Sequence, residues 1–256
     1  MHPIRLVLIL LVCLGPACRL QQSEDDAYRG RNPLDRMIEL RQPVEWQEGT
    51  AAAILVDTSG SMEDEVAGAD GAGTAKIVIA RRAVISLIRQ FEGYAQKHAD
   101  RRVLVGVYEF SSRDREPHCR RVIDLGPPAP AAAEDALGHM IPRGGTPIGD
   151  AMIQAKLDLD RTGLSRRHIL VVTDGKNNKG YSPGDVAEAI ANQPEASRAS
   201  LYFVAFDIGA DRFNQVKEAG GLVLEAANER DLNQTMDFIL TGKILAEQPA
   251  TPTENR

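Results

Sequence analysis

Apolar and polar positions alternate in blocks along most of the chain. Four apolar runs have little polar interruption, and continuous runs of this kind suit strands buried on both faces of a parallel sheet. These runs lie at 51–56, 102–108, 168–173 and 200–206. A shorter run at 119–125 is expected to pair with the second run as an antiparallel edge strand, and a last strand is expected at 221–226.

Helical periodicity appears between these runs. In 75–98 and 147–160, apolar residues recur at three- and four-residue steps, which places them on one stripe of a helix. Further helices are expected at 184–192, 210–219 and 229–245. The alternation of strands and helices predicts an α/β fold with a doubly wound, mostly parallel sheet, helices on both faces and one antiparallel edge strand.

The first 17 residues have the pattern of a secretory signal peptide. A positive charge precedes the apolar stretch LVLILLVCLG, which is too short to span a membrane, and small residues precede a cut after Ala17. The segment LGPAC resembles that of bacterial lipoproteins, in which Cys18 would be the acylated first residue. We expect membrane contact through a lipid anchor at Cys18. Plain secretion is the alternative, because the residues just before the cysteine depart from the usual lipoprotein motif.

Composition divides the rest of the chain into three parts. Residues 18–48 are polar and are expected to be a linker, 49–245 a single domain, and 246–256 a disordered tail. The 256 residues are 43% apolar and 26% charged, as in ordinary globular proteins. The net charge of −6, without a basic face interleaved with aromatic residues, argues against nucleic acid as a partner.

The stretch AILVDTSGSM carries the first candidate chemistry, because Asp57 ends an apolar run and Ser59 and Ser61 follow at alternate positions. Three hypotheses compete: a polar turn, a nucleophilic aspartate, or oxygen ligands for a hard cation. A turn does not predict a second carboxylate at another strand end, yet Asp174 directly follows 168–173. A phosphotransferase of the haloacid-dehalogenase type needs a second acid where Ser59 stands.

The cation hypothesis explains more of the sequence. Mg²⁺ prefers oxygen ligands, which carboxylates and hydroxyls supply. Parallel strands would bring Asp57 and Asp174 to the same edge of the sheet, beside the hydroxyls of Ser59 and Ser61. The loop RGGTPIGDAM adds Thr146 after two glycines, which allow the backbone to come close.

In order and spacing, these five residues resemble the metal-ion-dependent adhesion site of a von Willebrand factor type A domain of bacterial type, and the resemblance covers roughly residues 50–245. It implies that the hydroxyls of Ser59, Ser61 and Thr146 coordinate the cation directly. Asp57 and Asp174 would coordinate it directly or through water. The resemblance favours Mg²⁺, with Mn²⁺ or Ca²⁺ as alternatives.

A site rich in neutral hydroxyls leaves the cation incompletely neutralised, so an Asp or Glu of a partner protein would complete it. Without the metal, Asp57 and Asp174 would face each other uncompensated. The main hypothesis is a protein-binding module, not an enzyme, that is exported to the bacterial cell envelope, either facing the periplasm or at the surface. In some relatives, contact at the metal is linked to movement of the last helix, which corresponds to 229–245.

Two other functions stay open. The metal could simply staple the loops of a structural envelope protein, or it could assist a hydrolase, which would need a base or a second metal. Asp207 also ends an apolar run, but the family motif does not use that position, and we interpret it as structural.

Overall fold

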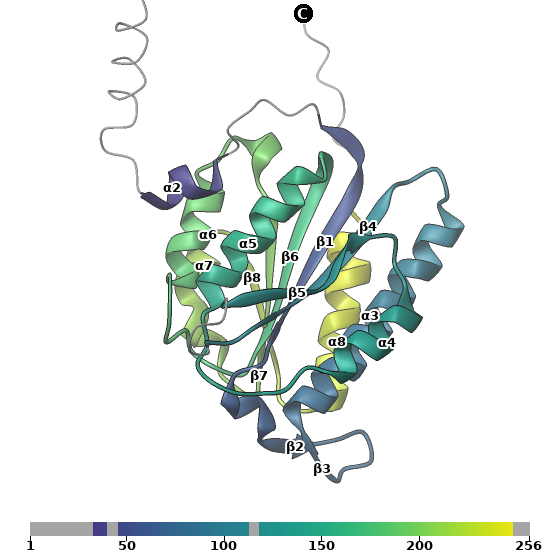
Figure 1. Cartoon of the computed structure of the whole chain (residues 1–256), viewed down its shortest axis with the longest axis vertical. Helices are drawn as coiled ribbons and strands as arrows, with labels where there is room; N and C mark the ends of the chain where they lie inside the picture. The colour runs from purple at the N-terminus through teal and green to yellow at the C-terminus, as the bar shows by residue number, and fades with distance from the viewer. Residues whose placement is uncertain (1–32, 40–45, 113–117, 248–256) are drawn as a thin grey trace, which may run out of the picture.

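Figure 1 shows the computed structural model, which describes residues 33–39, 46–112 and 118–247. The strands of the main sheet are β1 (Gln47–Asp57), β4 (Val103–Phe110), β5 (Cys119–Gly126), β6 (Leu164–Thr173), β7 (Ser200–Phe206) and β8 (Leu222–Ala226). Their order is β5-β4-β1-β6-β7-β8, with every neighbouring pair parallel except β4 and β5. The predicted doubly wound sheet with one antiparallel edge strand is therefore confirmed.

Helices cover both faces of this sheet (Figure 1). On one face lie α2 (Pro33–Ile38), α5 (Ile148–Arg161), α6 (Pro183–Ala191) and α7 (Asn214–Glu218). On the other lie α3 (Lys76–Lys97), α4 (Pro130–Gly138) and α8 (Glu229–Ile239), which continues into a π-helical turn, η4 (Leu240–Ile244). Short 3₁₀ turns are η1 (Gly60–Glu63), η2 (Glu195–Ser197) and η3 (Ala210–Phe213). Within the described segments, no helix combines the length and apolarity needed to cross a bilayer.

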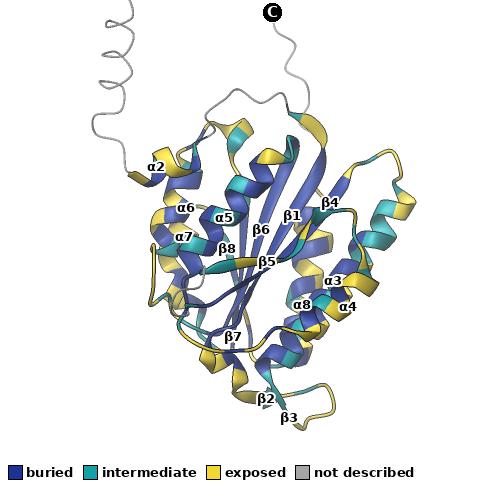
Figure 2. Cartoon of the chain, viewed as in Figure 1, coloured by how far each residue is buried: buried dark blue, intermediate teal, exposed yellow. Residues whose placement is uncertain are grey.

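The central strand explains why its sequence is apolar without interruption. Successive side chains of a strand point to opposite faces, and both faces of β1 are covered. Ala53 and Leu55 belong to the core beneath α5, whereas Ile54 and Val56 belong to the core beneath α3 and α8. Figure 2 shows β1 and β6 buried along most of their length between the two helical layers.

Helix α2 lies within the segment that the sequence predicts to be a linker. Leu34 and Ile38 are buried in the same core as residues of α5 and α6. The carbonyl of Ile38 accepts a hydrogen bond of 2.7 Å from Nε2 of Gln193. Helix α2 therefore packs against the domain. The predicted signal peptide and Cys18 lie outside the described residues, as do residues 248–256 of the predicted tail.

Besides α2, a hairpin and a helix were not expected from the sequence. The hairpin consists of β2 (Glu65–Ala67) and β3 (Gly73–Ala75), and the helix is α4. Both are short and largely exposed, so they lack the long apolar pattern that marks the other elements. The last predicted helix is present, and four of its apolar residues are buried: Leu232, Met236, Ile239 and Leu240.

A cation–π contact and a histidine–carboxylate contact join both ends of the domain to the amino half of β6. The guanidinium of Arg167 lies 3.7 Å from the ring centre of Trp46, which directly precedes β1. Nε2 of His168 lies 3.6 Å from a carboxylate oxygen of Glu247, beyond η4. The described domain thus begins and ends at the edge of the sheet opposite to the carboxyl ends of its parallel strands.

We expect Ile38→Ala to lower the free energy of unfolding by about 2–5 kcal/mol, the range for truncating a buried aliphatic side chain. Ile38 is 0% exposed, whereas its neighbour Met37 is 43% exposed. Met37→Ala on the same helix should therefore change stability by less than about 0.5 kcal/mol. Urea unfolding of both variants measures the difference. Equal effects would mean that α2 does not pack as described.

Candidate metal site

The candidate site lies where β1 and β6 end. These strands pair in parallel, with Val56 opposite Val172, so Asp57 and Asp174 reach the same edge of the sheet. Asp57 is the last residue of β1 and Asp174 directly follows β6. The chain after Asp57 turns into η1, which Ser59 directly precedes and which contains Ser61. The sheet therefore brings together residues that are more than a hundred positions apart in the sequence.

Asp57 is fully buried and held by two hydrogen bonds. Its Oδ1 accepts from the backbone N–H of Ser59 at 2.7 Å, and its Oδ2 accepts from the hydroxyl of Thr173 at 2.6 Å. Burial raises the pKa of Asp57 to about 7, although the hydrogen bonds from Thr173 and Ser59 oppose this rise. The carboxylate is thus costly to keep ionised unless a positive charge compensates it.

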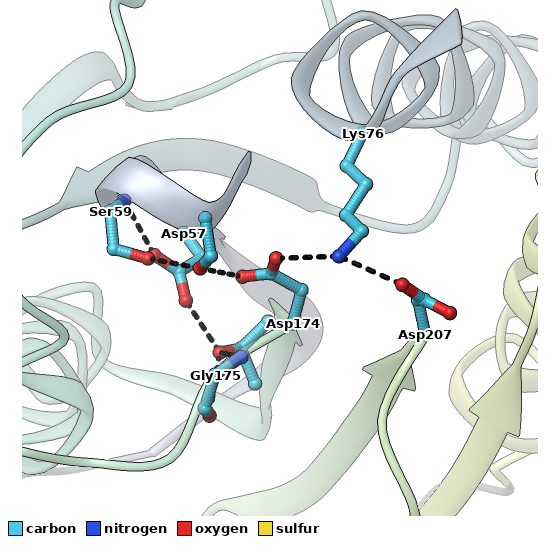
Figure 3. Close-up of polar contacts among 8 residues, drawn as sticks. Asp57, Ser59, Lys76, Asp174, Gly175 and Asp207 are labelled. Carbon is cyan, nitrogen blue, oxygen red and sulfur yellow. Dashed lines mark hydrogen bonds and ion pairs between the residues drawn. The ribbon is translucent and has the colours of Figure 1, made fainter. Parts of the chain in front are cut away.

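The serine hydroxyls connect Asp57 to Asp174 (Figure 3). The hydroxyl of Ser61 donates to Oδ1 of Asp174 at 2.8 Å, and the hydroxyl oxygens of Ser59 and Ser61 lie 3.3 Å apart. Four of the five residues expected as ligands are therefore joined in one hydrogen-bonded cluster.

Thr146, the fifth, lies against the same cluster. A Cβ atom built on Gly175 would lie 3.2 Å from the hydroxyl oxygen of Thr146 and 3.8 Å from Oδ2 of Asp57. The Thr146 side chain and the Asp57 carboxylate thus approach the same glycine from different loops. All five sequence-predicted residues come together at one end of the sheet.

The loop that carries Thr146 is shaped by a glycine and by two asparagines. Gly144 has a φ of 79°, and a Cβ atom there would lie 2.0 Å from the carbonyl oxygen of Ser112. The side chain of Asn178 accepts from the N–H of Thr146, and that of Asn177 accepts from the N–H of Ile148, each at 2.8 Å. Sequence reasoning missed both asparagines, although they lie only three and four residues after Asp174.

Lys76 also lies at the candidate site, where the sequence did not indicate it. Its Nζ lies 3.1 Å from Oδ2 of Asp174 and 2.8 Å from Oδ2 of Asp207 (Figure 3). Burial lowers the pKa of Lys76, but hydrogen bonds with Asp207 and Asp174 outweigh it and raise that pKa overall. The expectation that Asp57 and Asp174 face each other uncompensated is therefore wrong, because an ammonium group neutralises Asp174.

The chemistry of the donors can be compared with what different metals prefer. The cluster offers two carboxylates and three hydroxyls, all hard oxygen donors of the kind that Mg²⁺ or Ca²⁺ takes. Over the described ranges, no group of three or more His, Cys, Asp or Glu residues is placed to hold a metal. The candidate site consequently depends on its hydroxyls, and its donor set fits a hard cation.

Comparison with known proteins agrees with the fold. A family model described as the von Willebrand factor type A domain matches residues 52–176, a segment that contains all five candidate ligands. No curated protein sequence matches the chain at a significant level. The fold is that of a von Willebrand factor type A-like domain: α/β, with a mostly parallel six-stranded sheet surrounded by helices.

Three solved structures illustrate the likeness. The von Willebrand factor type A protein from Catenulispora acidiphila is 21% identical with a TM-score of 0.59, over 79% of this chain and 44% of that one. The PilB minor pilin from Streptococcus sanguinis is 14% identical with a TM-score of 0.59, over 81% and 65%. The pilus adhesin SpaC from Lactobacillus rhamnosus GG is 15% identical with a TM-score of 0.55, over 77% and 31%. The chain thus spans less than two thirds of each of these proteins.

We expect the stability of the protein in chelator to fall as pH rises from about 4 to about 7. A carboxyl with a raised pKa holds its proton more tightly in the folded state than in the unfolded state. For Asp57, the resulting stabilisation is complete below pH 3.8, the ordinary pKa, and it disappears as the pH rises to the folded-state pKa of about 7. One such group gives a slope of about 1.4 kcal/mol per pH unit in that window.

The measurement is urea unfolding across this pH range for the wild type and for Asp57→Asn. The variant removes the titrating group while keeping the size of the side chain, so its pH dependence should be flatter by the slope of one proton. If the two profiles run parallel, the Asp57 carboxyl does not carry the raised pKa.

Proposed function

We propose that this chain is an exported, lipid-anchored von Willebrand factor type A domain that binds a partner protein through a divalent cation, completed by an Asp or Glu of that partner. The observation that carries this proposal is the convergence of five oxygen-bearing side chains at the carboxyl end of β1 and β6. The likeness to the family supports a role in protein interaction.

Each residue has a defined part in this proposal. Ser59, Ser61 and Thr146 would each offer a neutral hydroxyl oxygen. Asp57 and Asp174 would offer the negative charge, from a buried edge that excludes much of the competing water. When bound, the cation would supply a positive centre that is incompletely neutralised, because Asp174 is shared with Lys76. A carboxylate of another protein is the hard, anionic ligand that suits it.

The direction of the fold supports the proposed anchoring. Trp46 and Glu247 lie at the amino edge of the sheet, whereas Asp57 and Asp174 lie at the opposite edge. A chain tethered at Cys18 would therefore hold its candidate site away from the membrane, where a partner can reach it. Two of the similar structures are a minor pilin and a pilus adhesin, which also supports a place in the cell envelope.

The metal claim predicts that Mg²⁺ stabilises the wild type but not Asp57→Ala. At a concentration of 100 times its dissociation constant, a ligand that binds only the folded state adds about 2.7 kcal/mol. Asp211→Ala is the matched control, because Asp211 is an exposed acid in η3, just beyond β7. Thermal unfolding in Mg²⁺, Mn²⁺, Ca²⁺ and chelator measures the effect. An equal response of wild type and Asp57→Ala would remove the basis for a metal site.

The binding claim predicts that a partner is captured from envelope extract by the mature chain in Mg²⁺, and lost in chelator or with Asp57→Ala. Asp211→Ala should capture as the wild type does. Amidation of the carboxyl groups of the extract should abolish capture, because the partner is expected to supply an Asp or Glu. Metal-dependent stability without metal-dependent capture would instead favour the structural-staple function. Metal-dependent cleavage of model esters, lost in Asp57→Ala, would favour a hydrolase.

A further inference from the structure

Lys76, Asp174 and Asp207 form an ion triad beside the candidate metal site, in which Lys76 and Asp174 are buried and the side chain of Asp207 is exposed. Lys76 is 5% exposed, and its ammonium contacts one oxygen of each carboxylate (Figure 3). Asp174 is shared between two partners, since its Oδ2 faces Lys76 while its Oδ1 accepts from Ser61. One carboxylate thus belongs both to the triad and to the candidate ligand set.

The fold places each member of this triad from a different element. Lys76 is the first residue of α3, and its backbone N–H donates to the carbonyl of Asp64 at 2.9 Å. Asp207 follows β7 with a φ of 55°, a left-handed conformation that is uncommon outside glycine. Its N–H donates to the carbonyl of Ala226 at 2.7 Å. Backbone contacts therefore fix Lys76 and Asp207 where their side chains meet.

We propose that Lys76 is a built-in countercation of the metal site, which holds Asp174 in place before any metal binds and weakens the binding of the metal. The proposal rests on the proposed function, because it concerns the same site. In this proposal Lys76 is a positioning residue. Asp207 takes up part of the positive charge of Lys76, because both carboxylates contact the same ammonium group.

Lys76 affects both the charge and the orientation of the Asp174 carboxylate. The ammonium takes Oδ2 of Asp174, so only Oδ1 faces Ser61 and the remaining candidate ligands. A cation arriving at that face would meet a carboxylate whose charge is already partly neutralised, and it would also be repelled by the ammonium behind it. A metal held in this way keeps more of its positive charge for an external anion. Lys76 would thus lower the affinity of the site for the metal and strengthen the attraction of the bound metal for a carboxylate of the partner.

The test is the Mg²⁺ dissociation constant, measured by calorimetry on the mature chain. We expect Lys76→Met to tighten Mg²⁺ binding by at least about tenfold, the repulsion that one positive charge a few ångströms from a divalent cation gives even at the dielectric constant of water. The same variant should melt at a lower temperature than the wild type in chelator, because Asp174 and Asp207 lose their shared partner. Arg89→Met is the matched control: it removes one positive charge from an exposed position on the same helix and should change neither quantity.

A second variant tests the same inference in case the Lys76→Met chain does not fold. Asp207→Asn leaves Lys76 to Asp174 alone, so it should weaken Mg²⁺ binding several-fold. Unchanged affinity in a folded Lys76→Met, or unchanged or tighter binding in Asp207→Asn, would overturn the inference while leaving the proposed function intact. If only Lys76→Met binds Mg²⁺, the inference stands and the proposed metal-dependent function of the wild type fails. If neither the wild type nor any variant binds Mg²⁺, the inference and the proposed function both fail.

Discussion

The loops at the carboxyl ends of the buried parallel strands are arranged so that hydrogen-bond donors and a positive charge compensate the carboxylates there. Asp57 must end a strand that is buried on both faces, so its carboxylate has little access to water. The backbone of Ser59 and the hydroxyl of Thr173 turn toward it, and burial still raises its pKa to about 7. The loops around it are shaped by the same need, because each brings a donor or a positive charge to this edge.

At the opposite edge of the sheet, buried positive charges must also be compensated. Arg166 and Arg167 lie near the amino end of β6 and are almost fully buried. Glu48 pairs with Arg166, while Asp160 and the ring of Trp46 contact Arg167. Glu48 and Trp46 come from the beginning of the domain, so their contacts join the start of β1 to the neighbouring strand β6. The amino edge is thereby tied to the domain's own chain, whereas the carboxyl edge gathers oxygen atoms suited to an external cation.

The sequence predicted what depends on periodicity and on strand direction. Long apolar runs marked the strands, and the parallel pairing of β1 with β6 was enough to expect Asp57 and Asp174 together. Lys76 could not be recognised in this way, because a lysine at the start of an amphipathic helix has the pattern of a solvated surface residue. Its role depends on Asp207, which is 131 positions away (207 − 76) and turned into a left-handed conformation. The hairpin before Lys76 was missed for the related reason that two three-residue strands carry almost no pattern.

The ion triad changes what a metal could contribute to this protein. If Asp174 had no internal partner, a cation would be needed simply to keep the loops of the site together, and loss of metal would resemble loss of the fold. Lys76 supplies one positive charge from within, and the raised pKa of Asp57 allows that carboxyl to hold a proton near neutral pH. The folded domain therefore has its own means of tolerating both carboxylates. A divalent cation at this edge would then act on recognition more than on folding, because the surface it completes is already assembled by hydrogen bonds and one ammonium group.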